Sequence, residues 1–212
     1  MRRKNQVYDY LLEAILSNKI PSGATIAETD IANELNMSRT PIREALKELE
    51  ADGLVIRYPS RGTVVSPITP YDVEEIFSLR IMLESYALQL AWDKISIAEI
   101  ENIEKMFMEL DSDSPKDAYR KADTCLHALI IDRSGNRRLK EFLNILNGQI
   151  ERFRRIAASE PNRLNNSKRE HLEILSLLKQ HDIKACEESL KRHLTNVKNS
   201  TLEVAKLSAM QG

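Results

Sequence analysis

The sequence predicts a mainly α-helical protein in two parts: a winged helix-turn-helix, then an antiparallel all-α bundle of six helices. Three observations support this fold class. Residues 1–66 combine short helical patterns with two β-rich runs, and Pro67 and Pro70 bracket a short linker. Almost everything after residue 70 follows the helical period, with the short connections that are typical of antiparallel bundles. The chain of 212 residues is long enough for two such domains.

The first part reads as three helices and a hairpin. A helical pattern runs to about residue 19, where Pro21-Ser22-Gly23 interrupts it. A second helix is expected over 28–35, and a third begins at Ser38 or Thr40 and ends near Ala51. Two β-rich runs follow, and Pro59-Ser60-Arg61-Gly62 between them is typical of a hairpin turn.

The second part reads as six amphipathic helices with short breaks. We expect these helices at about 71–93, 96–110, 115–133, 137–158, 164–180 and 183–208. The domains are therefore predicted as 1–66 for the winged helix-turn-helix, 67–70 for the linker and 71–212 for the bundle.

Composition excludes several classes of protein. The formal net charge is −1, from 31 Lys or Arg and 32 Asp or Glu, which argues against a protein coated in positive charge. No apolar run approaches the length of a membrane span, and the basic N-terminus lacks the apolar stretch of a signal peptide. Cys125 and Cys186 stand alone, so a reducing cytoplasm is the expected location and no membrane partner is expected.

The third helix has a pattern that suits DNA. Its apolar residues Ile42, Ala45, Leu46 and Leu49 must face a core. Arg39, Arg43 and Lys47 recur every four residues on another face, and the N-terminal end of a recognition helix enters the major groove. Such a stripe is often only a solvated face, and residues 1–66 carry nine basic and nine acidic side chains. The argument for DNA therefore depends on placement and not on total charge.

Within this helix, Ser38-Arg39-Thr40-Pro41-Ile42-Arg43-Glu44-Ala45-Leu46 resembles the recognition helix of GntR-family bacterial transcription regulators. The stretch Leu49-Glu50-Ala51-Asp52-Gly53-Leu54-Val55 extends the resemblance. It implies DNA contacts from Ser38, Arg39, Thr40 and Arg43, and from Arg61 and Gly62 in the wing; Lys47 joins them through the cationic stripe. Thr29 stands where some members carry a basic residue, which argues against base contacts from the second helix.

Three of the four histidines are expected to face the interior of the bundle. Asp123 and His127 are four residues apart and share a helix face with apolar residues. His171 and His193 lie on the apolar sides of the fifth and sixth bundle helices. A single histidine of this kind is more often a hydrogen-bonded core residue, but three beside a carboxylate favour a divalent metal site. Zn²⁺ is the first choice, and Ni²⁺, Mn²⁺ and Fe²⁺ are alternatives.

An arginine is expected among apolar residues of the first bundle helix. Arg80 and Glu84 are four residues apart on its inward stripe. One interpretation is an internal Arg–Glu ion pair. The other is a guanidinium that faces the cavity and binds an anionic ligand through two hydrogen bonds.

The second part is similar to the FCD effector domain of FadR-type GntR regulators, in its shorter six-helix form. The similarity lies in Arg80 and Leu83-Glu84, in Asp123-Thr124-Cys125-Leu126-His127, in Glu170-His171 and in His193-Leu194. It implies a metal held by Asp123, His127, His171 and His193. It also implies a small carboxylate or sugar-acid effector that reaches the metal and Arg80, with Glu84 beside it.

The leading hypothesis is a ligand-responsive transcriptional regulator of a bacterial cytoplasm that binds a pseudo-palindromic operator as a homodimer, with repression as the expected output. A metal-sensing regulator without an organic effector is one alternative. A helical metalloenzyme is another, but it lacks an obvious general base, because Glu170 is expected to face elsewhere on its helix. The protein is therefore expected not to be an enzyme.

Overall fold

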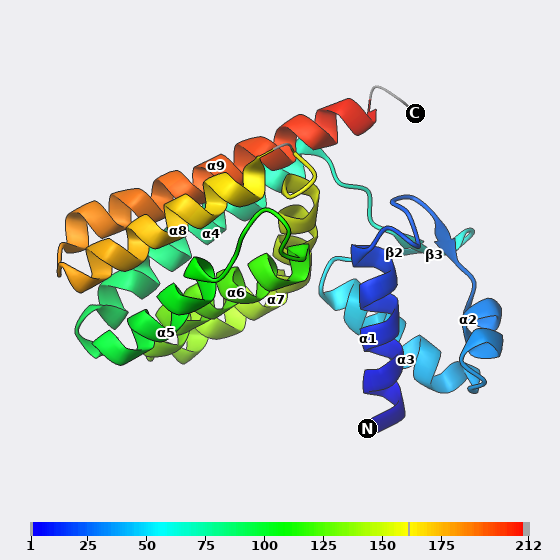
Figure 1. The fold of residues 1–212 in the computed structure, drawn as a ribbon. Helices are drawn as coiled ribbons and strands as arrows, with labels where there is room; N and C mark the ends of the chain where they lie inside the picture. The colour runs from blue at the N-terminus through cyan, green and yellow to red at the C-terminus, as the bar shows by residue number, and fades with distance from the viewer. Residues whose placement is uncertain (1, 161, 210–212) are drawn as a thin grey trace. The chain divides into compact units, whose positions relative to one another are not determined.

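The computed structural model describes residues 2–160 and 162–209, and Figure 1 shows a helical protein with one small sheet. The predicted fold class is confirmed. The chain divides into two compact units, one of Met1–Thr69 with Asn144–Arg155 and the other of Pro70–Leu143 with Ile156–Gly212.

The first unit is built from α1 (Arg2–Leu16), α2 (Glu28–Glu34) and α3 (Arg39–Ala51), with strands β1 (Thr25–Ile26), β2 (Val55–Tyr58) and β3 (Gly62–Val65). The helices α1 and α3 pack together, and α2 packs on α3. Their common core contains the predicted inward residues of α3, Ile42, Ala45, Leu46 and Leu49, together with Val7, Leu11, Ile15 and Ile31 from α1 and α2.

The sheet has the strand order β1-β3-β2 and is antiparallel. The pairing of Tyr58 with Gly62 closes the β2–β3 hairpin, which forms the predicted wing. The strand β1 was not predicted, because two residues are too few for the alternating pattern that identifies a strand. The partner of β1 is the central strand β3, with Ile26 opposite Thr63.

The second unit contains α4 (Pro70–Ala91), α5 (Ile97–Met108), α6 (Lys116–Arg133), α8 (Arg163–Lys179), α9 (Ile183–Ala209) and part of α7 (Arg137–Ala157). Within the described residues, the six helices α4–α9 match the predicted number, and their ends lie within about three residues of the predictions. A short 3-10 helix, Trp92–Lys94, follows α4 where the sequence had suggested a longer α-helix. The helix α4 packs against α6 and α9, and α8 packs against α5, α6 and α9.

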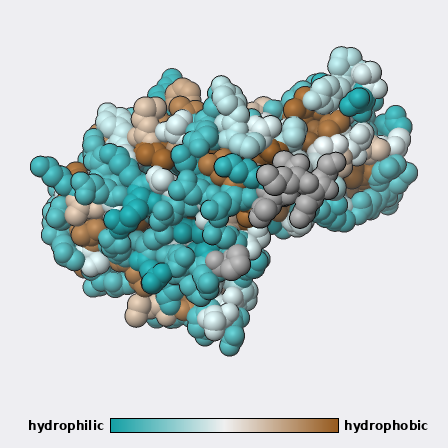
Figure 2. All heavy atoms as spheres, turned by 90° about the horizontal axis from the view of Figure 1, so that it is seen from above, coloured by the Kyte–Doolittle hydropathy of each residue, from teal (hydrophilic) through white to brown (hydrophobic). Residues whose placement is uncertain are grey.

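The surface and the core differ as expected for a globular protein. The face shown in Figure 2 is mostly hydrophilic, with smaller apolar areas between polar ones. The core of the second unit gathers apolar side chains from α4, α5, α6, α8 and α9. Within the described residues, no helix is both long enough and apolar enough to cross a membrane.

Candidate nucleic-acid interface and metal centre

The helix α3 separates apolar and cationic side chains onto different faces. Its apolar residues Ile42, Ala45, Leu46 and Leu49 are fully buried. Arg39, Arg43 and Lys47 are exposed, as are Ser38 and Thr40 at the start of the helix. Ser38 occupies the N-cap position but makes no capping hydrogen bond through its side chain. The hydroxyl of Ser38 is therefore not committed to the end of its own helix.

The wing presents Arg61 and Gly62 at the tip of the β2–β3 hairpin. Both residues are exposed. Gly62 has a φ of +74°, a left-handed conformation that residues with a side chain adopt only with strain. The glycine is therefore needed for the turn itself, and its small size leaves the tip of the wing open to a partner.

In the second unit, three helices bring together the four predicted metal ligands. Asp123 and His127 come from α6, His171 from α8 and His193 from α9. One potential ligand atom of each side chain lies within 4.8 Å of every other. The Oδ1 atom of Asp123 is 3.3 Å from Nε2 of His171 and 3.7 Å from Nε2 of His127. All three histidines are buried, and the Asp123 side chain is 14% exposed.

The Nδ1 atoms of the three histidines all contact polar side chains. His127 Nδ1 lies 2.5 Å from Oε2 of Glu84, and His193 Nδ1 lies 2.7 Å from Oε2 of Glu170. Ser167 Oγ lies 3.4 Å from Nδ1 of His171. A neutral imidazole beside a carboxylate donates from the nearer nitrogen, so His127 and His193 carry the proton on Nδ1. The lone pair of Nε2 is therefore available in both rings.

Burial favours the neutral form of the His127 and His193 imidazoles. Burial lowers the pKa of His127, although the nearby carboxylates of Glu84 and Asp123 oppose this effect. Burial, reinforced by the neighbouring His171, lowers the pKa of His193 well below its usual value. Neutral imidazole is the form that binds metal ions.

The arrangement fits a divalent transition metal. Among the residues that the structure describes, the Nε2 atoms of His127, His171 and His193 are buried and have no hydrogen-bond partner. Leaving three such nitrogens buried is costly unless something binds them. Zinc bonds of about 2.0–2.1 Å in a tetrahedral site separate ligand atoms by about 3.4 Å. The distances from Asp123 to His171 and to His127 bracket this value, and all four ligand atoms lie within 4.8 Å of one another. The donor set therefore has a composition that suits Zn²⁺ and a spacing close to the one that Zn²⁺ needs.

Each of the two carboxylates that contact a histidine Nδ1 atom is held by an arginine. Nε of Arg80 donates to Oε1 of Glu84 at 2.6 Å, and both side chains are almost fully buried. The internal Arg–Glu pair, one of the two interpretations of Arg80, is therefore present. Both Nη atoms of Arg163 contact the carboxylate of Glu170, one of them at 3.0 Å from Oε1. Asn196 also donates to Glu170 Oε1, at 2.9 Å.

Glu170 directly precedes His171, so the helical period turns the two side chains to different sides of α8, as expected. The inference that no further carboxylate lies near the candidate ligands was wrong, because α9 packs on α8 and brings His193 within 2.7 Å of Glu170. Burial alone would raise the pKa of Glu170, yet the hydrogen bonds from His193 and Arg163 outweigh burial and hold this pKa well below its usual value. A polar groove of about 580 Å³ along α8 and α9 is lined by Arg163 and Glu170 among others.

Comparison with known proteins identifies both parts of the chain. Residues 3–65 match the family described as bacterial regulatory proteins of the gntR family, and residues 75–196 match the FCD domain. An uncharacterized HTH-type transcriptional regulator, YdhC of Bacillus subtilis, is 30% identical over 195 residues, which cover 90% of this chain and 87% of that protein. A probable D-xylose utilization operon repressor of Paenarthrobacter nicotinovorans is 27% identical over 192 residues, with 90% and 84% covered.

Solved structures show the same fold. A GntR-type regulator from Rhodococcus sp. RHA1 has a TM-score of 0.76 at 20% identity and covers 96% of this chain and 99% of its own. The Zn²⁺-bound FCD domain of the regulator TM0439 has a TM-score of 0.57 at 26% identity, covering 65% of this chain and 96% of its own. The related proteins are regulators and not enzymes.

Proposed function

Because the chain belongs to the GntR family of bacterial regulatory proteins and carries an FCD domain, we propose that it is a metal-assisted, effector-responsive repressor. It is a DNA-binding transcriptional regulator and not an enzyme. In the proposal, a homodimer binds a pseudo-palindromic operator, and a small carboxylate or sugar acid in the FCD domain changes its affinity for DNA.

One observation carries the sensing part of this proposal. Three buried histidines from α6, α8 and α9 direct unpartnered Nε2 atoms at the region occupied by Asp123. In the proposal, Asp123, His127, His171 and His193 hold one divalent metal. Zn²⁺ is preferred because its ligand spacing fits and because the FCD domain of TM0439 has been solved with Zn²⁺ bound. Ni²⁺, Mn²⁺ and Fe²⁺ remain alternatives.

The bound metal would supply an electrophilic centre for a carboxylate oxygen of the effector. Among the residues of the chain, Glu84 and Glu170 orient His127 and His193, and Arg80 holds Glu84 in place. In the proposal, the guanidinium of Arg80 also contributes positive charge to effector binding. An effector regulates the protein only if it binds the DNA-competent and DNA-incompetent states with different affinity.

The proposed DNA contacts come from α3 and the wing. In the proposal, Arg39 in the first turn of α3 and Arg43 one turn later enter the major groove, because the N-terminal end of a recognition helix makes the base contacts. Ser38, Thr40 and Lys47 add hydrogen bonds and charge, and Arg61 with Gly62 extends the contact from the wing. Half of the contacts or more are expected to reach phosphates, which position the protein without reading sequence.

The outer face of α4 supports the proposed homodimer. Leu79, Met82 and Tyr86 lie on one side of this helix and are 43%, 59% and 49% exposed. Between Ser78 and Leu90, the charged residues of α4 are Arg80 and Glu84, and both are buried. A helix that is apolar on all sides is normally buried. An uncharged patch can also meet its own copy across a two-fold axis without repulsion.

A DNA-binding assay with defined metal content tests the proposal. The wild-type protein selects a duplex from a random pool, and small organic acids that raise its melting temperature when metal-loaded are then added to the complex. We expect one acid to weaken binding to the selected duplex, and His171→Ala with His193→Ala to abolish both stoichiometric metal and the response to that acid. If metal alone changes DNA affinity and no acid does, the metal-sensing alternative replaces this proposal.

A further inference from the structure

An ion pair joins the two helices of the helix-turn-helix at the predicted DNA-reading surface. Nε of Arg43, in the second turn of α3, donates to Oε2 of Glu28 at 2.7 Å. Glu28 is the first residue of α2, and 15 residues separate the partners along the chain. The Arg43 side chain is 56% exposed and that of Glu28 is 28% exposed.

The pair limits how the guanidinium of Arg43 can approach another partner. An arginine side chain is long and has many rotamers, and an anchored Nε removes much of that freedom. The contact occupies Nε and leaves the edge formed by the two Nη groups for a pair of acceptors. Arg39 and Lys47, the other cations on this stripe, have no ion-pair partner among the residues that the structure describes, so Arg43 is the one held in a single direction.

A carboxylate at this position is not explained by stability or by general affinity for DNA. Exposed ion pairs contribute little to stability. A negative charge beside the DNA-reading helix repels the phosphates of every duplex and so weakens binding without regard to sequence. If the Glu28 carboxylate favours binding in another way, that gain must apply to the operator sequence or its geometry and not to every duplex.

We propose that Glu28 is a positioning residue for operator recognition. It holds the guanidinium of Arg43 with its Nη edge toward one pair of acceptors, and its charge weakens binding to all other duplexes. The acceptors are O6 and N7 of a guanine or two oxygens of one phosphate. This inference rests on the proposed function, since it requires that α3 reads DNA.

The test compares affinity for two duplexes of equal length at one salt concentration. One duplex is the sequence that the wild-type, full-length protein selects from a random pool, and the other has mixed sequence. For Glu28→Gln we expect affinity for the selected duplex to fall about three- to tenfold, and affinity for the mixed duplex to rise about two- to threefold. The ratio of the two affinities therefore falls about tenfold.

Glu34→Gln is the matched control. It makes the same change of charge in the same helix, and Glu34 is paired with Lys19 at 3.1 Å in an ion pair that is more exposed than that of Glu28. We expect this variant to leave the ratio unchanged. If Glu28→Gln raises both affinities equally, Glu28 acts only through its charge and the inference is wrong. If Glu28→Gln changes neither affinity, the pair is an ordinary surface ion pair and the inference is wrong as well.

A double-mutant cycle distinguishes positioning from an independent effect. If Glu28 acts through Arg43, Glu28→Gln adds no further loss of affinity for the selected duplex in an Arg43→Ala background; fully additive losses contradict the inference. A repeated selection with Glu28→Gln then identifies the acceptors. A relaxed preference at one base pair per half-site indicates guanine, and an unchanged preference with a shallower salt dependence indicates phosphate.

The two levels of hypothesis fail in different ways. If the wild-type protein selects no duplex, the proposed function fails and the inference falls with it. If the wild-type protein selects a duplex, and Arg39→Ala and Arg43→Ala weaken its binding, the proposed function stands. An unchanged affinity ratio in Glu28→Gln then rejects the inference alone.

Discussion

Glu84 and Glu170 act on two different histidines in the same way. Each accepts from the Nδ1 of a buried imidazole and is held by an arginine, Arg80 in one case and Arg163 in the other. Partners of this kind set the tautomer and the ring orientation of metal-binding histidines and increase their basicity. They differ in their surroundings, because Glu84 is buried in the bundle whereas Glu170 borders the polar groove.

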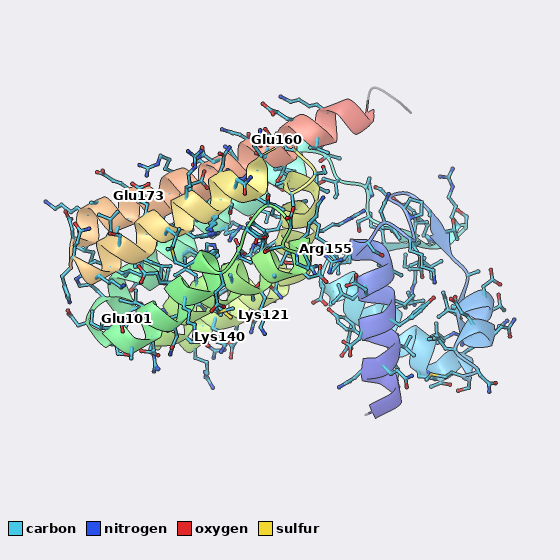
Figure 3. The ribbon with its side chains drawn as sticks, viewed as in Figure 1. Glu101, Lys121, Lys140, Arg155, Glu160 and Glu173 are labelled. Carbon is cyan, nitrogen blue, oxygen red and sulfur yellow. The ribbon has the colours of Figure 1, made fainter. Side chains whose placement is uncertain are left out.

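Replacing Glu170 should weaken metal binding without unfolding the bundle. In Glu170→Gln, the amide can still contact His193 but no longer favours the proton on Nδ1, so we expect metal affinity to fall about 10- to 100-fold. Competition with a chromogenic chelator measures this change. Glu173→Gln is the control, because Glu173, labelled on α8 in Figure 3, pairs with the exposed Arg192. Equal metal affinity in wild type and Glu170→Gln would show that Glu170 has no part in the site.

Replacing Glu84 should instead reduce stability even without metal. Glu84→Ala leaves the charge of Arg80 inside the bundle without this carboxylate, and removing one member of a buried ion pair costs about 3–5 kcal/mol. Urea unfolding of the metal-free protein measures the free energy of unfolding. The double variant Arg80→Met with Glu84→Leu should recover most of the loss, because it removes both charges. A loss below about 1 kcal/mol in Glu84→Ala would mean that water or another group compensates Arg80.

At the scale of residues, the sequence indicates which side chains gather in the bundle better than it indicates what they contact. Asp123 and His127 were predicted to lie together because spacing within one helix determines which residues share a face, and the structure brings both close to His171 and His193. The contact between Glu170 and His193 joins two helices, and it depends on how α8 and α9 pack and on side-chain rotamers. The periodicity of a single helix does not show which side chains of two different helices touch. The acidic residue directly before His171 was the only feature of the sequence that pointed to a carboxylate near the histidines.

At the scale of elements, the ends of the helices follow from local chemistry. Ser96 caps α5 by accepting from the backbone of Glu99, and Glu99 accepts in return from the backbone of Ser96. The predicted helices at 71–93 and 96–110 leave a break close to this cap, and the capping box itself is a local sequence motif. The strand β1 and the 3-10 helix after α4 were missed, because each is only two or three residues long and depends on tertiary contacts.

The capping box of α5 predicts a specific sensitivity to acid. Hydrogen bonds from the backbone and side chain of Ser96, with further help from Arg133, lower the pKa of Glu99 to about 2. A folded-state pKa below the unfolded value of about 4.3 means that this stabilisation is complete above that value and is lost as pH falls toward 2. We therefore expect Glu99→Gln to be less stable than wild type at pH 7 and to lose less stability between pH 5 and pH 2.5. Urea unfolding at several pH values measures both effects, and parallel curves for the two proteins would contradict the prediction.

For the whole molecule, total charge gives a poor guide to function. A net charge of −1 is compatible with DNA binding because the first domain places a few cations on one helix face and on one wing. Residues 1–66 carry nine basic and nine acidic side chains, so each copy of this domain attracts DNA of arbitrary sequence only weakly. If the protein binds its operator as the proposed dimer, recognition depends on two half-sites bound together, and the oligomeric state is part of the mechanism.

The exposed apolar side chains of α4 give a prediction about dimer formation. Met82 lies at the centre of the uncharged stripe between Leu79 and Tyr86, so Met82→Glu would place two carboxylates close together across a two-fold axis. We expect sedimentation velocity to show a dimer for wild type and a monomer for Met82→Glu at micromolar concentration. Affinity for a selected two-half-site duplex should fall at least about tenfold, while affinity for a single half-site stays unchanged. Met108→Glu is the control, because Met108 is also a highly exposed methionine but ends α5. A Met82→Glu protein that remains a dimer would place the interface on another surface and leave the apolar face of α4 to a different partner.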